Sequence, residues 1–266
     1  MRILFLGDIV GEPGRKAVIK QLTHIKRKHS IDFSIVNGEN SAGGRGITPK
    51  IAKELFAAGV NVITTGDHVW DQRELLDYLP TQPKLLRPIN YPPETPGNGS
   101  VVVETEFGSI AVLNAQGRTF MNPPLENPFT IVETEVNRLT EDGVKIIFLD
   151  FHAETTSESI AMGFHLDGKV SAVVGTHTHV QTADERILPQ GTAHLTDAGM
   201  CGPEISVLGR NVESVVFRFK SGLPTRFPVA KGPVRLCGMI VDIDPDTGRA
   251  THVERYNHLL SPSEMG

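Results

Sequence analysis

Val-Val-Gly-Thr-His-Thr-His, at residues 173–179, is the stretch around which the rest of the chain is interpreted. The residues that lead into it, Ser171–Val174, are few, mostly apolar and β-branched, which predicts a buried strand. In an extended chain, residues i and i+2 point to the same side. We therefore expect His177 and His179 to leave the strand end as two imidazoles aimed at one point, an arrangement that suits a transition metal.

The same design recurs at four other places, where an apolar strand runs directly into a residue type that binds metals. These strand ends are Gly7-Asp8, Asn37-Gly38-Glu39-Asn40, Gly66-Asp67-His68 and Asp150-Phe151-His152. Ligands of open α/β sheets lie outside the carboxyl ends of the strands. A single Asp or Asn there is usually a turn or cap residue. Because five strand ends share the pattern, we predict that their side chains converge on one cleft.

The length, net charge and cysteine count limit the classes of protein to which the chain can belong. The 266 residues fit one large α/β domain, which we place over residues 1–266. A net charge of −5 argues against a general nucleic-acid surface. Cys201 and Cys237 are the only cysteines, too few for a disulfide framework or a cysteine-based zinc site. No apolar run reaches the ~20 residues of a membrane span, and the first residues do not resemble a signal peptide, so we expect a cytoplasmic protein without a membrane partner.

Apolar patterning along the chain alternates strands with helices. Helices are predicted near residues 17–25, 49–58, 71–78, 129–140 and 157–166, and a β-hairpin over Val101–Leu113. After residue 180, four stretches alternate like antiparallel strands: Thr192–Thr196, Val212–Phe219, Leu236–Ile243 and Thr251–Tyr256. We therefore expect the C-terminal third to form a second, mostly antiparallel sheet that shares one core with the first.

The candidate ligands exceed the needs of one tetrahedral ion. They are Asp8, Glu39, Asn40, Asp67, His152, His177 and His179. Mixed carboxylate, amide and imidazole donors fit two first-row ions, such as Fe, Mn or Zn, bridged by a carboxylate. Two such ions about 3.5–4 Å apart clamp the attacking and leaving oxygens of a phosphoryl transfer.

His68 directly follows one predicted ligand, Asp67. In an extended segment its side chain points the other way, so it can lie beside the metals without binding them. An imidazole in that position is suited to act as general acid for the leaving oxygen. The alternative interpretation of His68 is an inert imidazole packed next to the centre.

These motifs resemble the metallophosphoesterase (calcineurin-like) superfamily and, over essentially the whole chain, its YmdB-like bacterial phosphodiesterase branch. The residues that carry the resemblance are Gly7-Asp8, Gly66-Asp67-His68, Gly175–His179, Asn37-Gly38-Glu39-Asn40 and Asp150-Phe151-His152-Ala153-Glu154. The resemblance implies an α/β fold, a four-layer α/β/β/α sandwich of two mixed sheets. It also implies a dinuclear centre, iron above all, and phosphodiesterase activity on cyclic nucleotides, 2′,3′-cyclic ones in particular.

Carried over residue by residue, the resemblance also implies roles at the centre. One metal is held by Asp8, Asn40 and His179, the other by Asp67, His152 and His177, and Glu39 bridges them. A hydroxide bridging the metals would be the nucleophile, and His68 the proton donor. Two departures stand out. The superfamily usually has Asp-x-His where this chain has Asp8-Ile9-Val10, a difference that the YmdB-like branch shares, and it usually has Asn at the position of Asp67.

The order of the histidines excludes two other hydrolase classes. A metallo-β-lactamase would need His-x-His-x-Asp-His, whereas this chain continues Val180-Gln181-Thr182. An amidohydrolase barrel would carry its His-x-His near the first strand, whereas this chain has it late, at His177 and His179. One alternative stays open, a regulatory protein that binds a cyclic nucleotide through the same metals without turnover. In both cases the expected partner is a small phosphodiester, and a homo-oligomer is compatible with the sequence.

Overall fold

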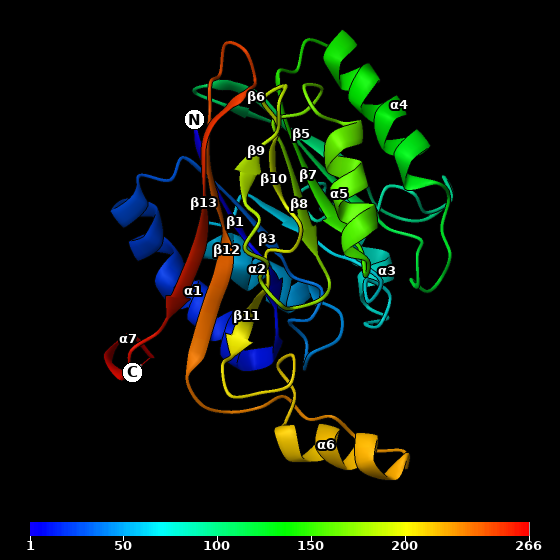
Figure 1. Ribbon diagram of the computed structural model, residues 1–266, viewed down its shortest axis with the longest axis vertical. Coiled ribbons are helices and arrows are strands. Elements are labelled where there is room, and N and C mark those ends of the chain that lie inside the picture. Colours follow the sequence, from blue (N-terminus) through cyan, green and yellow to red (C-terminus); the bar gives the residue numbers. More distant parts are fainter. Residues whose placement is uncertain (266) are drawn as a thin grey trace.

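Two β-sheets lie face to face between two layers of helices in the computed structural model, which describes residues 1–265 (Figure 1). Helices α1 (Gly11–His29) and α2 (Pro49–Ala57) cover one sheet, and α4 (Pro128–Glu141) and α5 (Thr156–His165) cover the other. The prediction of a four-layer α/β/β/α sandwich of two mixed sheets is therefore confirmed.

The first sheet contains seven strands. They are β1 (Arg2–Leu6), β2 (Asp8–Ile9), β3 (Phe33–Asn37), β4 (Val62–Thr64), β11 (Met200–Pro203), β12 (Val234–Ile243) and β13 (Ala250–Leu259). Their order is β2-β11-β12-β1-β3-β4, and β13 also pairs with β12. The first strand of the chain, β1, lies inside the sheet, parallel to β3 and antiparallel to β12.

The second sheet contains six strands. They are β5 (Ser100–Thr105), β6 (Gly108–Gln116), β7 (Ile146–His152), β8 (Ala172–Thr176), β9 (Arg186–Ile187) and β10 (Ala193–Leu195). Their order is β5-β6-β7-β8-β10-β9, with β6, β7, β8 and β10 parallel. The antiparallel pair of β5 and β6 is the predicted hairpin, which is confirmed.

Apolar side chains from both sheets fill the space between them. In β1, Ile3 and Phe5 face the second sheet, whereas Leu4 and Leu6 pack in the cluster that includes α1 and α2. The rings of Phe5 and Phe148 stack across the interface, with their centroids 5.5 Å apart. The strand is apolar along most of its length because both of its faces are covered. This packing fixes the position of the residues that follow the strand.

Two predictions about the C-terminal third are wrong. Val212–Phe219, predicted as a strand, belongs to helix α6 (Val212–Ser221). The side chain of Asn211 caps this helix by accepting a hydrogen bond from Ser214 N, and Gly222 ends it with a left-handed φ of 71°. Within the described residues there is no separate C-terminal sheet, because β12 and β13 extend the first sheet and β9 and β10 extend the second.

The remaining helices lie close to their predicted positions, with one exception. The helix predicted over residues 71–78 is shortened to α3 (Leu75–Tyr78), which continues into the 3₁₀ helix η1 (Leu79–Thr81). A short helix, α7 (Pro262–Met265), lies near the C-terminal end. In the part of the chain that the structure describes, no helix has the length and apolar character needed to span a bilayer.

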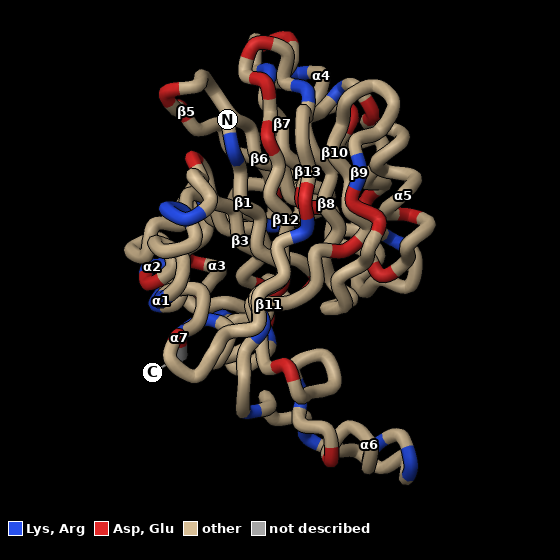
Figure 2. Tube along the Cα trace, turned by 60° about the vertical axis from the view of Figure 1, so that its left-hand side comes forward, with Lys and Arg blue, Asp and Glu red and all other residues tan. Residues whose placement is uncertain are grey.

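One segment stands apart from the sandwich. Residues 204–233, which connect β11 to β12, project from the body and carry α6, as Figures 1 and 2 show. We refer to residues 204–233 as the arm.

Candidate metal centre

The seven predicted ligands lie at the carboxyl ends of strands from both sheets. Asp8 follows β1, and Asp67 follows β4, in the first sheet. His152 is the last residue of β7, and His177 follows β8, in the second. The structure thus brings together residues more than one hundred positions apart in the sequence, at one edge of the sheet interface.

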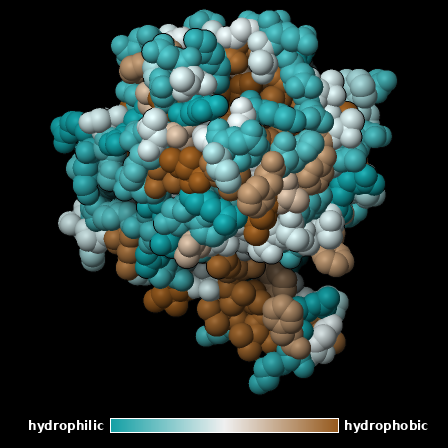
Figure 3. All heavy atoms as spheres, turned by 45° about the horizontal axis from the view of Figure 1, so that its top comes forward, coloured by the Kyte–Doolittle hydropathy of each residue, from teal (hydrophilic) through white to brown (hydrophobic). Residues whose placement is uncertain are grey.

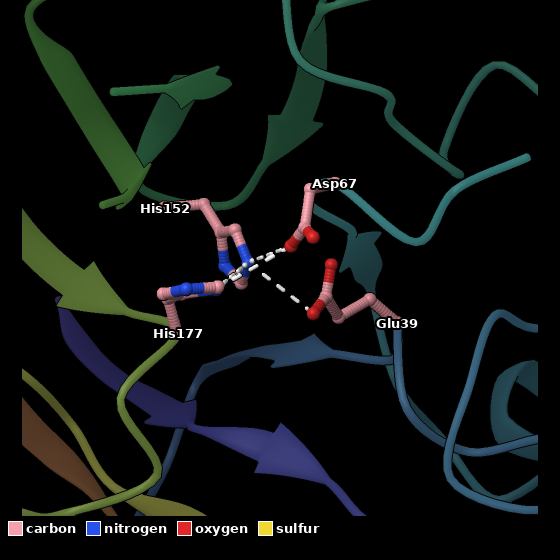
Figure 4. Close-up of side chains that lie close together, drawn as sticks. All are labelled: Glu39, Asp67, His152 and His177. Atoms are coloured by element: carbon pink, nitrogen blue, oxygen red, sulfur yellow. Dashed lines mark hydrogen bonds and ion pairs between the residues drawn. The ribbon is translucent and has the colours of Figure 1, made fainter. Parts of the chain in front are cut away.

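Four of these side chains form one contact group, shown in Figure 4. The ligand atoms of Glu39, Asp67, His152 and His177 all lie within 4.8 Å of one another. His152 Nε2 is 3.2 Å from Glu39 Oε1 and 3.1 Å from Asp67 Oδ1. His177 Nδ1 is 3.4 Å from the same Asp67 oxygen.

The other three predicted ligands form a second group beside the first. His179 Nε2 is 3.2 Å from Asn40 Nδ2 and 3.9 Å from Asp8 Oδ1. Asn40 Nδ2 also donates to Glu39 Oε1 at 2.9 Å, so Glu39 contacts both groups. Ligation by Asn40 would use its amide oxygen and requires that side chain to rotate. The two groups match the two ligand sets that the resemblance implies, and their role in metal binding stays a prediction.

Each of the three imidazoles is held by a partner outside the centre. His152 Nδ1 lies 2.8 Å from the Thr176 hydroxyl, His177 Nε2 lies 3.1 Å from the Glu154 carboxylate, and His179 Nδ1 lies 3.1 Å from the Leu208 carbonyl. Because a carbonyl only accepts, neutral His179 carries its proton on Nδ1 and presents Nε2 to the centre. Outer partners of this kind fix the tautomer and orientation of metal-binding histidines.

The backbone at the two histidines is not extended, so the extended geometry predicted for His177 and His179 is wrong. The strand ends at Thr176, and His177 and His179 have φ values of 110° and 66°. Such conformations at non-glycine residues cost about 1–3 kcal/mol each and persist where the surroundings fix them. Here Asp8 Oδ2 accepts from His177 N at 3.2 Å. Strain at these positions is typical of a functional site.

Asp197, which was outside the predicted set, supports this loop. Its buried carboxylate accepts from the backbone N and the hydroxyl of Thr178, both at 2.9 Å, and from Gly199 N at 2.7 Å. Burial raises the pKa of Asp197 to about 6. In the sequence, Asp197 directly follows the predicted strand Thr192–Thr196, which is the same pattern that identified the candidate ligands at the other five strand ends.

Asp150 was also outside the predicted set. It is buried in β7 and accepts hydrogen bonds from Thr64, Thr176 and Asn37. Since Thr176 also contacts His152 Nδ1, Asp150 helps to hold that imidazole through the hydroxyl. Its role is therefore to position a candidate ligand.

The charged groups of the centre shift one another's protonation. Burial raises the pKa of Asp8 well above its usual range. Burial opposes ionisation of Glu39 and Asp67 as well, but their contacts with His152 outweigh it and lower both pKa values. Burial would lower the pKa of His152, but those two carboxylates raise it well above its usual range. Burial lowers the pKa of His179 to about 4, so this imidazole is neutral at pH 7, the form that binds metal.

A buried atom at this centre lacks a partner that a cation would supply. Among the described residues, Asp8 Oδ1 is fully buried and makes no hydrogen bond, although its neighbour His179 Nε2 lies 3.9 Å away. Buried carboxylate oxygens are normally paired or bound to a metal. Together with the converging carboxylates and imidazoles, this orphan oxygen means that the residues present fit a metal centre.

His68 lies beside the four-residue contact group rather than in it. Its Nδ1 is 3.3 Å from Asp71 Oδ2 and 3.8 Å from Asp67 Oδ2. The segment is a turn, with Val69 N donating to Gly66 O, so the extended backbone predicted for His68 is wrong. The proton-donor role of His68 stays a prediction.

A cleft of about 420 Å³ opens over the centre. One part of its lining consists of candidate site residues, namely Glu39, Asn40, His68, His177 and His179. The other part comes largely from the arm, including Val215, Phe219 and Phe227. The centre is therefore open to a small molecule, and the arm forms a wall of the access route.

The sequence and fold of this chain are similar to those of known proteins. The family model described as "YmdB-like protein" matches residues 4–256. The chain is 49% identical to the 2′,3′-cyclic-nucleotide 2′-phosphodiesterase of Bacillus subtilis over 258 residues, 96% of each chain. Among solved structures, a phosphatase from Mycoplasma pneumoniae is 35% identical with a TM-score of 0.92, covering 100% of this chain and 96% of that one. A hypothetical protein from Thermus thermophilus is 38% identical with a TM-score of 0.90, covering 97% and 99%.

Proposed function

This chain is a phosphodiesterase of the YmdB-like protein family, and we propose that it hydrolyses cyclic nucleotides, 2′,3′-cyclic nucleotides above all. The observation that carries the proposal is the position of Glu39, which contacts both ligand groups at the base of an open cleft. Further support is the name of the Bacillus subtilis relative, a 2′,3′-cyclic-nucleotide 2′-phosphodiesterase.

In this proposal the centre holds two transition-metal ions, iron in preference to manganese or zinc. Asp8, Asn40 and His179 would hold one ion, and Asp67, His152 and His177 would hold the other. Glu39, which contacts both groups, would be shared between them. Bound ions of this kind neutralise charge on the phosphoryl oxygens and lower the pKa of water. The chain's own groups supply the remaining functions.

In the hydrolysis, the oxygen of water forms a new bond to phosphorus as one P–O bond of the cyclic ester breaks. His68 is proposed to give a proton to the ribose oxygen that leaves. Its position at the lining of the cleft, outside the contact group of ligands, supports this role. Asp71 Oδ2 lies 3.3 Å from His68 Nδ1 as an ion-pair partner, which leaves Nε2 for the substrate. Arg45 in turn pairs with Asp71 at 2.9 Å and helps to hold that carboxylate.

The test is reconstitution of the purified chain with Fe, Mn or Zn, followed by elemental analysis and assay of 2′,3′-cyclic AMP hydrolysis. We expect about two ions per chain and metal-dependent product release. His177→Ala should remove both, whereas His165→Ala, on the outer helix α5, should remove neither.

Two outcomes would contradict the proposal. A chain that takes up no metal after reconstitution has no metal centre of the kind described. A chain that binds the metals and the nucleotide without turnover is instead a regulatory nucleotide-binding protein.

A further inference from the structure

We propose that the arm is the nucleobase subsite of this centre, with Phe219 and Phe227 forming the surface against which the base of the substrate lies. This inference rests on the proposed function, since it concerns the part of the same substrate that the metals do not contact.

The first observation is that the arm and the centre line one continuous cleft. His177 and His179 contribute to the same lining as Phe219 and Phe227. A phosphodiester placed at the histidines therefore extends either to solvent or along the arm. The cleft volume of about 420 Å³ is within the range of small-ligand sites, roughly 300–1,000 Å³.

The second observation is that the arm is fixed to the centre. The Leu208 carbonyl accepts from His179 Nδ1 at 3.1 Å. The Arg210 guanidinium donates to the carbonyls of Gly43 and Phe227, at 3.2 and 3.1 Å, and to that of Gly44. Since Gly43 and Gly44 follow the ligand Asn40 in one loop, Arg210 ties the wall of the cleft to the ligand loop. The wall thus has a defined place relative to the metals.

The third observation is that the arm exposes large apolar side chains. Figure 3 shows hydrophobic residues gathered on the projecting arm at the bottom of the view. Phe219 is 84% exposed although it borders the cleft, and Phe227 is 39% exposed. An exposed apolar patch next to a polar centre is typical of a ligand-binding surface. Aromatic side chains are the usual partners of nucleobases, which stack on them.

The fourth observation is the excess of positive charge in the arm. Within the arm, five basic residues stand against two acidic ones, although the whole chain has a net charge of −5. The basic residues are Arg210, Arg218, Lys220, Arg226 and Lys231, and the acidic ones are Glu204 and Glu213. A locally basic and apolar surface fits an occupant that is both anionic and aromatic. A nucleotide has both properties.

The polar lining of the cleft further indicates how the base is recognised. Apart from the candidate site residues, its polar side chains already have partners. Arg210 donates to backbone carbonyls, Glu154 contacts His177, and Thr178 donates to Asp197. Few groups are left to read the edge of a base, so the wall holds bases by stacking, which every base permits. We therefore expect kcat/KM values within about tenfold for the 2′,3′-cyclic phosphates of adenosine, guanosine, cytidine and uridine.

The experiment compares two substrates that share the five-membered cyclic phosphate, of which only one carries a nucleoside. These are 2′,3′-cyclic AMP and glycerol 1,2-cyclic phosphate, assayed with the metal-loaded protein. Phe219→Ala should lower kcat/KM for 2′,3′-cyclic AMP about 5- to 150-fold, the loss expected for one stacking contact, and should leave the glycerol ester within about twofold. Phe217→Ala is the matched control, because Phe217 is on the same helix and 51% exposed but does not line the cleft. It should change neither rate.

Three results would overturn the proposal. The first is an equal loss on both substrates after Phe219→Ala, which would give the residue a structural role. The second is an equal effect of Phe217→Ala and Phe219→Ala together with a change in molecular mass by light scattering, which would make the arm a contact between copies of the chain. The third is no effect of Phe219→Ala.

Binding of 3′-AMP and glycerol phosphate separates this proposal from the proposed function. Suppose that the unaltered protein hydrolyses neither cyclic ester but binds 3′-AMP more tightly than glycerol phosphate, and that Phe219→Ala loses this preference. The proposed reaction is then wrong, and the proposed subsite is supported. If both esters are hydrolysed regardless of Phe219, the reaction stands and the subsite is wrong.

Discussion

Asp67 is found where the superfamily that the chain resembles usually has Asn, and its carboxylate lies between two imidazoles. Its Oδ1 is 3.1 Å from His152 Nε2 and 3.4 Å from His177 Nδ1. With Asp8 and Glu39 it brings the candidate ligands to three carboxylates. Before a hydroxide is bound, two divalent ions would then leave about one positive charge, and Asn at this position would leave about two.

Asp67→Asn is therefore expected to raise kcat on a phosphodiester at saturating metal, because a more positive centre attracts the substrate and lowers the pKa of water more strongly. An amide is a poorer ligand than a carboxylate, so the variant should also need more metal. A titration of activity against metal concentration separates the two effects. A slower variant at full metal occupancy would show that Asp67 has a positive catalytic role.

His68→Ala is expected to keep both metals and to lose about 10²–10⁴-fold in kcat on a ribose ester, the usual contribution of a general acid. The loss should shrink for a p-nitrophenyl ester, whose leaving group needs no proton. Elemental analysis and the two assays, made on the same preparation, distinguish a proton donor from a metal ligand. Equal losses on the two esters would make His68 a ligand or a structural residue.

At the scale of the elements, glycines at strand ends allow the ligands to approach one another. A side chain at Gly66, between β4 and Asp67, would overlap the carboxylate of Glu39 and the ring of His152. One at Gly175 would overlap the backbone of Thr196 in the neighbouring strand segment. The glycines of the Gly-Asp-His and Gly-Thr-His-Thr-His motifs are therefore required by space.

Gly66→Ala is accordingly expected to prevent normal metal loading, because its methyl group would displace Glu39 and His152. The apolar core does not contain Gly66, so the fold should persist. Metal content and the circular dichroism spectrum are to be measured together. Full metal occupancy in the variant would mean that the centre is more adaptable than these contacts allow.

The elements also show where inference from sequence succeeded and failed. The strands before Asp8, Asp67 and His152 were predictable, because covered strands are apolar along their length. The arm helix α6 was not, since its Val-rich sequence alternates like a strand, and only Asn211 and Gly222 mark its ends. The left-handed φ values of His177 and His179 depend on the contacts of Asp8 and Asp197, which no local pattern reveals.

At the scale of the whole molecule, the sequence predicted the location of the centre better than the path of the chain. Strand-end motifs indicated which side chains meet, because the sheets deliver them to one edge. They did not indicate that β12 inserts beside β1, or that β10 lies parallel to β8, since these pairings depend on long-range packing. Family resemblance supplied the layer order, and periodicity alone suggested a C-terminal sheet that does not exist among the described residues.

Removal of the metals should make the stability of the whole protein depend on pH. In the metal-free chain the pKa of His152 is raised, so its charged form stabilises the fold fully below about pH 6.5, and this contribution is lost as pH rises through the folded-state pKa. The raised pKa of Asp8 acts in the same direction. A ligated His152 holds no such proton.

We therefore expect the difference in Tm between the metal-loaded protein and the chelator-treated protein to widen from about pH 6 to about pH 9. Thermal unfolding with and without chelator at three pH values measures it, and His165→Ala is the control because His165 lies outside the centre. A constant difference over this range would mean that the proton is not bound at His152 in the metal-free chain.

The position of β1 inside the first sheet has a consequence for biosynthesis. Strand β1 leaves the ribosome before β12 and cannot complete its pairing until β12 is translated, more than two hundred residues later. At the usual rate of about 5–20 residues per second, this interval is roughly 10–50 s. Asp8 follows β1 directly, and β2 pairs with the late strand β11. All seven candidate ligands are synthesised by residue 179, but the partners of β1 and β2 follow later, so we expect the centre to load metal only after β12 has emerged.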